Sequence, residues 1–297
     1  MAGSIVCVGD VMQDVLVQLA EPLVPDSDTE ATVTFSPGGA GANTACWLGW
    51  LGSQVSFAGR VGDDCPGREA LAALQRFGVR PLLTVDRRLP TGSCIVLIGP
   101  DGERSMIPSA GANDALTPAD LAGLLTGADH LHLSGYTLLH EASRAAGQAV
   151  LAQAVAAGCG ISVDVGSAAP IRAVGAQRLL DWLPAGTLLL ANVEELAALT
   201  GERPDRATEL VAAGHVLVVK DGPRGARLID ADGSRLVPTE PVPAPDSTGA
   251  GDAFAAGLLA ARLAGQGWVE AIRAGNRTGA VAVSQLGAQP PEAQPAG

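Results

Sequence analysis

The sequence predicts an α/β fold, in which a doubly wound, mostly parallel sheet carries helices on both faces and a small β-sheet is added. Short continuous apolar runs recur along the chain, and such runs are typical of strands buried on both faces of a parallel sheet. They alternate with segments of helical periodicity, which implies right-handed βαβ connections. Two segments, about 15–35 and 91–108, instead alternate apolar and polar residues, which favours antiparallel hairpins outside the main sheet.

The length of 297 residues fits one α/β domain, 1–297, with a small appendage. Hydrophobic residues make up 47% of the chain and aromatic residues only 3%, so the core must consist mainly of aliphatic side chains. The formal net charge of −12 disfavours binding to nucleic acids or anionic membranes. We therefore expect neither as a partner.

The five cysteines are scattered, odd in number and lack a C-x-x-C pair, which indicates reduced thiols. The N-terminal residues lack a charged leader and run directly into an apolar strand. No apolar run reaches membrane-spanning length. These features predict a cytoplasmic protein.

The first predicted strand, 5–9, is followed by Asp10 and Asp14. Carboxylates beyond the carboxyl end of a parallel strand are well placed for ligand contact, although a turn-forming role is favoured for Asp10. A glycine-rich stretch, 37–43, then opens a helix that ends at Gly52. Its glycines permit close backbone approach and Asn43 can bind hydroxyl groups, but the stretch alone is equally compatible with a packing turn.

The middle of the chain alternates strands and helices. An Asp-Gly turn near residue 101 separates two alternating runs and indicates a hairpin, and Thr117-Pro118 is expected to open a helix. The four histidines lack metal-ligand spacing and are interpreted as structural. The predicted strands are 55–59, 129–134, 160–165 and 187–191, and the predicted helices are 67–77, 141–157 and 175–183.

Asn192 follows the strand 187–191, and Glu195 lies three residues later. This spacing predicts an N-cap with a capping box at the start of a helix. A further buried strand, 216–220, then leads into the glycine-containing turn 220–225.

The stretch 246–257 carries the strongest functional signal. Gly249, Ala250 and Gly251 begin a helix of small residues, whose exposed N–H groups and dipole form an anion site. Asp252 lies in the first turn, where a carboxylate would repel a resting phosphate. Its expected role is to take a proton from a hydroxyl that attacks a phosphoryl group.

This last stretch closely resembles the C-terminal signature of the ribokinase-like (PfkB) family of sugar and nucleoside kinases. The stretches 37–43, 59–64 and 192–195 resemble further motifs of the family, and the likeness covers residues 5 to about 290. It implies the ribokinase-like fold and an ATP-dependent kinase. It also implies that the segments 15–35 and 91–108 form a lid over the acceptor that is shared in a homodimer.

The resemblance implies that Asp14, Gly38, Gly39 and Asn43 bind the hydroxyls of a sugar-like acceptor. Many ribokinases carry Lys where this chain has Ala40 and Asn where it has Met12. These two departures argue against D-ribose as the substrate.

In the nucleotide half, the resemblance implies that Asn192 and Glu195 order Mg²⁺, its water and the phosphates, alone or together with their capping role. Family members contact the nucleotide through the residues that match Lys220, Gly222, Gly225 and Asn276 here. The loop 284–289 resembles a monovalent-cation loop, in which K⁺ would be held by Asp246, Thr248 and Gly287.

We therefore interpret the chain as a kinase with ATP and Mg²⁺ that phosphorylates a small sugar-like alcohol. Asp252 is the expected base, and the N–H groups of Gly249, Ala250 and Gly251 form the expected anion hole. Two alternatives remain open, a nucleoside kinase of the same fold and a non-catalytic sugar or nucleotide sensor. The scarcity of aromatic residues weighs against the first, and the intact Asp252 against the second.

Overall fold

The computed structural model describes residues 3–101, 104–201, 203 and 205–291. Within these residues, nine strands form a main sheet in the order β13-β12-β11-β10-β9-β8-β1-β4-β5. The strands from β11 to β5 are mutually parallel, whereas β12 and β13 are added antiparallel at one edge. The strands are β1 (Ser4–Val8), β4 (Gln54–Gly62), β5 (Arg80–Asp86), β8 (His130–Ser134), β9 (Gly160–Asp164), β10 (Leu188–Asn192), β11 (Val216–Lys220), β12 (Ala226–Asp230) and β13 (Gly233–Val237).

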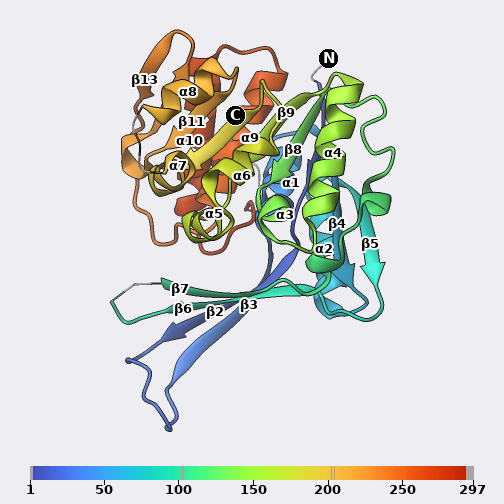
Figure 1. The fold of residues 1–297 in the computed structure, drawn as a ribbon. Coiled ribbons are helices and arrows are strands. Elements are labelled where there is room, and N and C mark those ends of the chain that lie inside the picture. The colour runs from blue at the N-terminus through green and yellow to red at the C-terminus, as the bar shows by residue number, and fades with distance from the viewer. Residues whose placement is uncertain (1–2, 102–103, 202, 204, 292–297) are drawn as a thin grey trace.

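Helices cover both faces of this sheet, as Figure 1 shows. One core cluster joins the sheet to α1, α2, α9 and α10, and contains Trp47, Phe57 and Phe254. The second joins the opposite face to α3, α4, α5, α6, α7 and α8. The doubly wound prediction is therefore confirmed. The helices are α1 (Ala40–Trp50), α2 (Cys65–Arg76), α3 (Tyr136–Leu139), α4 (Arg144–Ala157), α5 (Ala168–Val174), α6 (Ala176–Asp181), α7 (Val193–Thr200), α8 (Arg206–Ala212), α9 (Ala250–Leu263) and α10 (Trp268–Val283).

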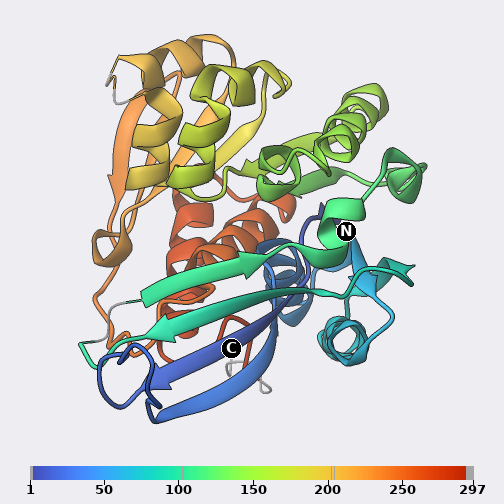
Figure 2. The same ribbon diagram turned by 60° about the horizontal axis from the view of Figure 1, so that its bottom comes forward.

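A separate small sheet projects from the body of the molecule (Figures 1 and 2). In the described part of the chain its order is β3-β2-β6-β7, built from β2 (Met12–Leu19), β3 (Ala31–Gly38), β6 (Gly92–Ile98) and β7 (Arg104–Ser109). These strands come from the two segments whose alternating pattern predicts hairpins. The Asp-Gly turn expected between the second pair extends into 102–103, outside the described residues.

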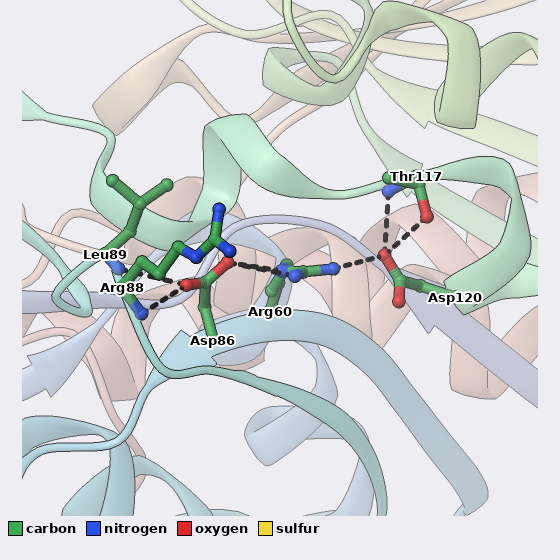
Figure 3. A network of polar contacts seen from close by, with 6 residues as sticks. All are labelled: Arg60, Asp86, Arg88, Leu89, Thr117 and Asp120. Carbon is green, nitrogen blue, oxygen red and sulfur yellow. Dashed lines mark hydrogen bonds and ion pairs between the residues drawn. The ribbon is translucent and has the colours of Figure 1, made fainter.

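Arg60, in the stretch 59–64 on β4, links the end of β5 to the 3₁₀ turn that contains Asp120 (Figure 3). Arg60 donates to Asp86 at 2.9 and 3.1 Å and to Asp120 at 2.9 Å. Asp86 also accepts from the N–H groups of Arg88 and Leu89. In the same stretch, Asp64 caps α2 through the N–H of Gly67 at 2.9 Å. The stretch 59–64 therefore has structural roles, since Arg60 joins neighbouring elements and Asp64 caps α2.

Some expected elements differ from those observed. Thr117-Pro118 opens only a short 3₁₀ turn, Pro118–Leu121, stabilised by a capping box between Thr117 and Asp120. The sequence did not predict the strands β5, β12 and β13 or the helices α3, α5 and α8. In the described residues, no helix is both long and apolar enough to cross a membrane.

Candidate active site

Polar side chains gather at the carboxyl ends of the parallel strands, which meet at one edge of the main sheet. Asp164 ends β9, Asn192 ends β10 and Lys220 ends β11, while Asp10 follows β1. The N-termini of α1 and α9 begin at the same edge, because Asn43 of α1 contacts Asp252 of α9. In open α/β sheets this edge is the usual ligand crevice.

Helix α9 begins without a side-chain cap. Gly249 adopts a left-handed φ of 72°, and a Cβ atom there would lie 2.6 Å from the backbone of Ala288, so only glycine fits. Among the described residues the N–H groups of Gly249 and Gly251 have no hydrogen-bond acceptor, whereas that of Ala250 donates to Ser247 O at 3.3 Å. The predicted helix start is confirmed, and it presents unfilled N–H donors.

Asp252 is enclosed among polar neighbours. The Asn43 amide donates to its Oδ2 at 3.0 Å. Burial raises the pKa of Asp252 well above its ordinary value, and the negative charge of Asp164 adds to this effect. The hydrogen bond from Asn43 and the charge of Lys220 act in the opposite direction. A carboxylate that is costly to ionise where it stands is a good proton acceptor.

Lys220, the chain's single lysine, lies between acidic side chains. Its ammonium donates to Asp164 Oδ2 at 2.7 Å. Burial alone would lower the pKa of Lys220, but Asp164, Glu195 and Asp252 together raise it, so the side chain stays charged. Its ammonium points to the edge of the sheet beside Asp164, and the expected contact of Lys220 with the nucleotide remains a prediction.

Asp14 lies on the small sheet, where it is 8% exposed. No hydrogen-bond donor to its carboxylate is found among the described residues. Burial raises the pKa of Asp14 to about 6, with further contributions from Asp10 and Asp246. A Cβ atom at Gly38 would lie 2.2 Å from Asp14 Oδ2, so the glycine makes room for this carboxylate.

Asp10 has a structural role, but it holds the start of α1 rather than forming a turn after β1. It accepts from the N–H groups of Ala40 at 2.9 Å and Gly41 at 3.4 Å, and from the Ser134 hydroxyl at 2.8 Å. These bonds satisfy donors at the start of α1. Gly39, just before that helix, has a φ of 98° and leaves no space for a side chain beside Asp10 O.

Two buried oxygens near the small sheet have no hydrogen-bond partner in the described structure, Asn43 Oδ1 and Ser36 Oγ. Ser36 is the cross-strand partner of Asp14, so their side chains share one face of the small sheet. Buried polar atoms normally have partners, and unpaired ones call for an explanation such as a ligand. Together with Asp14 they form a set of unsatisfied polar groups.

Asn192 and Glu195 form the predicted capping box. Asn192 Oδ1 accepts from Glu195 N at 2.8 Å, and Glu195 Oε2 accepts from Asn192 N at 2.7 Å. The Asn192 amide also donates to Glu195 Oε1 at 2.7 Å. Burial raises the pKa of Glu195 to about 7, although Lys220 acts against this rise. Their capping role is therefore present, and their role toward Mg²⁺ remains a prediction.

The turn 220–225 folds over a 3₁₀ helix, Gly222–Arg224. Gly225 has a φ of 97°, and a Cβ atom there would lie 2.3 Å from Val237 O. The amide of Asn276 on α10 donates to the carbonyls of Val237 and Pro238 at 3.2 and 3.3 Å. Both predicted nucleotide-contacting regions thus adjoin the segment that follows β13.

The predicted cation loop also comes together. The fully enclosed Asp246 accepts from Thr248 N at 2.8 Å and from Gly287 N at 2.9 Å. Trp47 of α1 donates to Ala288 O at 2.9 Å and fixes the loop against the core. The three residues expected to act together are therefore neighbours.

The sequence interpretation missed Asp164, Ser36 and Tyr136. Asp164 follows an apolar run, and that signal, the one used for Asp10, could have identified it. Tyr136 contacts the Ser167 hydroxyl, and burial raises its pKa to about 12 beside Asp10 and Asp164. For Ser36 and Tyr136 the sequence carries no comparable signal, because their positions depend on tertiary packing.

The profile of the family described as "pfkB family carbohydrate kinase" matches residues 2–295. An ATP-dependent ribose-1-phosphate kinase of Halopiger xanaduensis is 33% identical over 276 residues, which are 90% of this chain and 88% of that protein. A fructokinase of Vibrio alginolyticus is 30% identical over 285 residues, covering 90% of this chain and 91% of the relative.

Solved structures share the fold. An adenosine kinase from Sinorhizobium meliloti superposes with a TM-score of 0.86 at 22% identity, over 98% of this chain and 96% of that one. A putative ribokinase II from E. coli, in complex with ATP and Mg²⁺, superposes with a TM-score of 0.84 at 23% identity, over 96% and 94%. Since the family profile spans nearly the whole sequence, the chain belongs to the pfkB carbohydrate kinase family and is a kinase.

Proposed function

We propose that the protein transfers the γ-phosphoryl group of ATP to a hydroxyl of a small sugar-like acceptor. The observation that carries this proposal is Asp252, a half-buried carboxylate of raised pKa that accepts a hydrogen bond from Asn43 beside the uncapped start of α9. Positive N–H groups there stabilise the charge of the transferring phosphoryl, and the carboxylate takes the proton of the attacking hydroxyl.

The step requires Asp252 to be ionised and correctly oriented. Asn43 donates to one carboxylate oxygen, which leaves the other for the hydroxyl. The hydroxyl oxygen attacks the γ-phosphorus, the bond to the bridging oxygen of ADP breaks, and the proton moves to Asp252. Donors at Gly249, Ala250 and Gly251 complement the charge of the phosphoryl oxygens, with Ala250 first giving up its weak contact to Ser247.

The acceptor lies between α1 and the small sheet in this proposal. Asp14 and Asn43 Oδ1 are unfilled acceptors, and both suit sugar hydroxyls. Gly38 and Gly39 carry no side chains, and a Cβ atom at either position would collide with Asp14 or with the backbone of Asp10. The small sheet acts as a lid that excludes water, which would otherwise compete as a phosphoryl acceptor.

The nucleotide side uses Asn192, Glu195, Lys220, Gly222, Gly225 and Asn276. Both Glu195 oxygens already accept hydrogen bonds from Asn192, which suits a carboxylate that holds Mg²⁺ through water. When bound, Mg²⁺ neutralises phosphate charge. We assign the site formed by Asp246, Thr248 and Gly287 to a monovalent cation such as K⁺. The charge of this cation would offset that of the buried Asp246.

An acceptor panel tests this function. The purified protein is incubated with ATP, Mg²⁺ and, one at a time, neutral pentoses, hexoses, sugar acids, sugar phosphates and nucleosides, while ADP release is followed. We expect acceptor-dependent ADP release that is greatest with a sugar. If a nucleoside proved the best acceptor, the proposed acceptor class would change from sugar to nucleoside. The absence of any acceptor-dependent ADP release would contradict the proposal.

Glu195→Gln is expected to raise the Mg²⁺ concentration that gives half-maximal activity. Glutamine can still complete a capping box, so the start of α7 should remain folded. Removing the negative charge weakens the hold on the water shell of Mg²⁺. Activity titrated against Mg²⁺ checks this prediction, with Glu194→Gln, on the preceding residue, as the control. Equal Mg²⁺ dependence in all three proteins would leave Glu195 with capping alone.

The protein is further expected to form a dimer through the small sheet. Val15, Phe35, Ile95 and Ile107 pair across its four strands in one row. Phe35 is 62% exposed and Ile107 53%, and exposed apolar patches of this kind mark interaction sites. Sedimentation of wild type and Phe35→Glu should give a dimer and a monomer, with Val155→Glu on α4 as the control. A monomeric wild type would contradict this expectation.

The cytoplasm is the compartment that suits this chain. All five cysteines, each within the described residues, are free thiols, and Cys65 is exposed. Reducing conditions would keep them in that state. The net charge of −12 suits a partner set of small molecules rather than nucleic acids or anionic membranes.

A further inference from the structure

The ammonium group of Lys220 is incompletely bonded for a buried charge. An ammonium has three N–H donors, and the described structure gives this one a single hydrogen bond, to Asp164 Oδ2 at 2.7 Å. The Lys220 side chain is 15% exposed and that of Asp164 16%, so water reaches neither freely. Buried charges are normally paired and fully hydrogen-bonded. Two donors of Lys220 therefore remain for a ligand.

These donors lie at the start of α9. A Cβ atom built on Gly251 would be 3.1 Å from Lys220 Nζ, so the ammonium lies directly beside this glycine. Gly251 immediately precedes Asp252 and carries one of the unfilled N–H groups. The lysine charge and the helix start thus converge on one place, and both attract an anion.

Several carboxyl groups surround Lys220, but they differ in how closely they contact it. Asp164, Glu195 and Asp252 all act electrostatically on this lysine. Asp164 alone makes an ion pair with it. If the lysine served only to neutralise Asp164, its ammonium would not need to lie beside the glycine at the start of α9. A buried ion pair by itself is also weak support for a fold, since apolar residues often replace one without loss.

We propose that Lys220 is a catalytic residue whose ammonium group donates to the transferring phosphoryl group at the start of α9. Asp164 is then a positioning residue that holds Lys220 in place. The proposal rests on the proposed function and deepens it, since it moves Lys220 from the nucleotide-contacting loop to the reacting group. Lys220 remains protonated throughout, and the proton of the acceptor hydroxyl goes to Asp252.

A lysine at this place supplies what a phosphate-binding P-loop supplies elsewhere. The sequence lacks a G-x-x-x-x-G-K-[ST] motif, so a charge for the phosphoryl group must come from another element. Lysine acts on phosphates as a point charge, which needs proximity more than a fixed geometry. Its contribution should grow as the bridging oxygen leaves and negative charge redistributes in the transition state.

The test compares the wild type with Lys220→Met and with Lys220→Met/Asp164→Asn. Methionine keeps the length of the side chain without its charge, and the double variant removes both members of the ion pair. Calorimetry with Mg²⁺ measures the affinity for β,γ-imido-ATP and for ADP, thermal unfolding measures stability, and steady-state kinetics on the best acceptor measure kcat. ADP serves as the internal control because it lacks the γ-phosphoryl group.

We expect Lys220→Met to lower kcat by roughly 10²–10³, as for loss of one donor to a transition state. Binding of β,γ-imido-ATP should weaken about tenfold or more, in the range of a charge-assisted hydrogen bond, while ADP affinity stays the same. Lys220→Met should unfold at a lower temperature, because Asp164 loses its partner. The double variant should regain stability but neither kcat nor the affinity for β,γ-imido-ATP.

Two outcomes would overturn this inference. Recovery of wild-type kcat in the double variant would mean that Lys220 only neutralises Asp164. If Lys220→Met weakened the binding of β,γ-imido-ATP and of ADP equally, Lys220 would act on the part of the nucleotide that the two ligands share. Failure of the proposed function is a different result, since the wild type would then neither bind the two nucleotides nor release ADP with any acceptor.

Discussion

Asp252→Asn is expected to lower kcat by roughly 10²–10⁴, the usual contribution of a positioned general base. Asparagine keeps the size of the side chain and can still accept the hydrogen bond from the Asn43 amide. It has no basic oxygen for the hydroxyl proton. ATP affinity should stay the same or improve slightly, because a negative charge near the phosphates is gone. Steady-state kinetics and calorimetry with nucleotide measure both quantities.

Loss of folding would not account for this effect. Because burial raises the pKa of Asp252, ionisation of this carboxylate costs stability as the pH rises from its unfolded pKa through its folded pKa. Asparagine has no such cost, so at pH values above that range the variant should unfold at a temperature no lower than the wild type. Asp26→Asn, in an exposed turn with a φ of 57° that asparagine tolerates, is the matched control. Turnover near the wild-type rate in Asp252→Asn would remove this residue from the mechanism.

Asp14→Ala is expected to lower kcat/KM for the best acceptor by roughly 10–10³, because hydrogen bonds to a charged group lie at the strong end of about 1–3 kcal/mol. KM for ATP should hardly change, since Asp14 lies on the small sheet and the proposed nucleotide residues lie on β10, α7, β11, the turn 220–225 and α10. Steady-state kinetics with each substrate varied in turn check both parts. An unchanged kcat/KM for the acceptor would mean that the acceptor site has been assigned wrongly.

Asp14→Asn adds a pH signature to the same experiment. Burial, with help from Asp10 and Asp246, raises the pKa of Asp14 to about 6. The ionised carboxylate binds hydroxyls best, so the advantage of the wild type over Asp14→Asn in kcat/KM should be greatest above that pH. The advantage should shrink as the pH falls through about 6. A ratio independent of pH would contradict the role of the charge.

D-Ribose is expected to be a poor acceptor in the same panel. Met12 pairs with Gly38 across the small sheet, and Ala40 begins α1, so apolar groups stand where many ribokinases carry Asn and Lys. A sugar with a less polar or differently placed substituent should be preferred, because buried hydroxyls without partners cost about 1–3 kcal/mol each. D-Ribose as the best acceptor would contradict this argument.

Much of the fold follows from local patterns in the sequence. The apolar runs of β1, β10 and β11 are short, continuous and bounded by turns, so their length and composition identified them. The start of α9 was predicted because small residues and a glycine mark it. In contrast, β12 and β13 sit at an edge where one side is exposed, and their mixed sequence carries no clear period.

In the candidate site, too, some residues could be predicted from local sequence and others could not. Motif residues such as Asp14, Asn43, Asn192 and Glu195 could be named from spacing or resemblance. Their partners could not, because the contact of Asn43 with Asp252 joins residues separated by 209 positions. Lys220 was noticed through a loop motif, yet its ion pair with Asp164 depends on the order of strands in the sheet. Such contacts require the tertiary structure.

Identification of the product tests the proposed phosphoryl transfer most directly. Wild type and Asp252→Asn are incubated with Mg²⁺, ATP and the best acceptor, and phosphorus NMR with mass spectrometry follows the phosphoryl group. We predict that the wild type forms one new phosphomonoester of the acceptor in equal amount to ADP, at a rate roughly 10²–10⁴ times that of Asp252→Asn. Inorganic phosphate in place of the ester, or equal ester formation by both proteins, would contradict it.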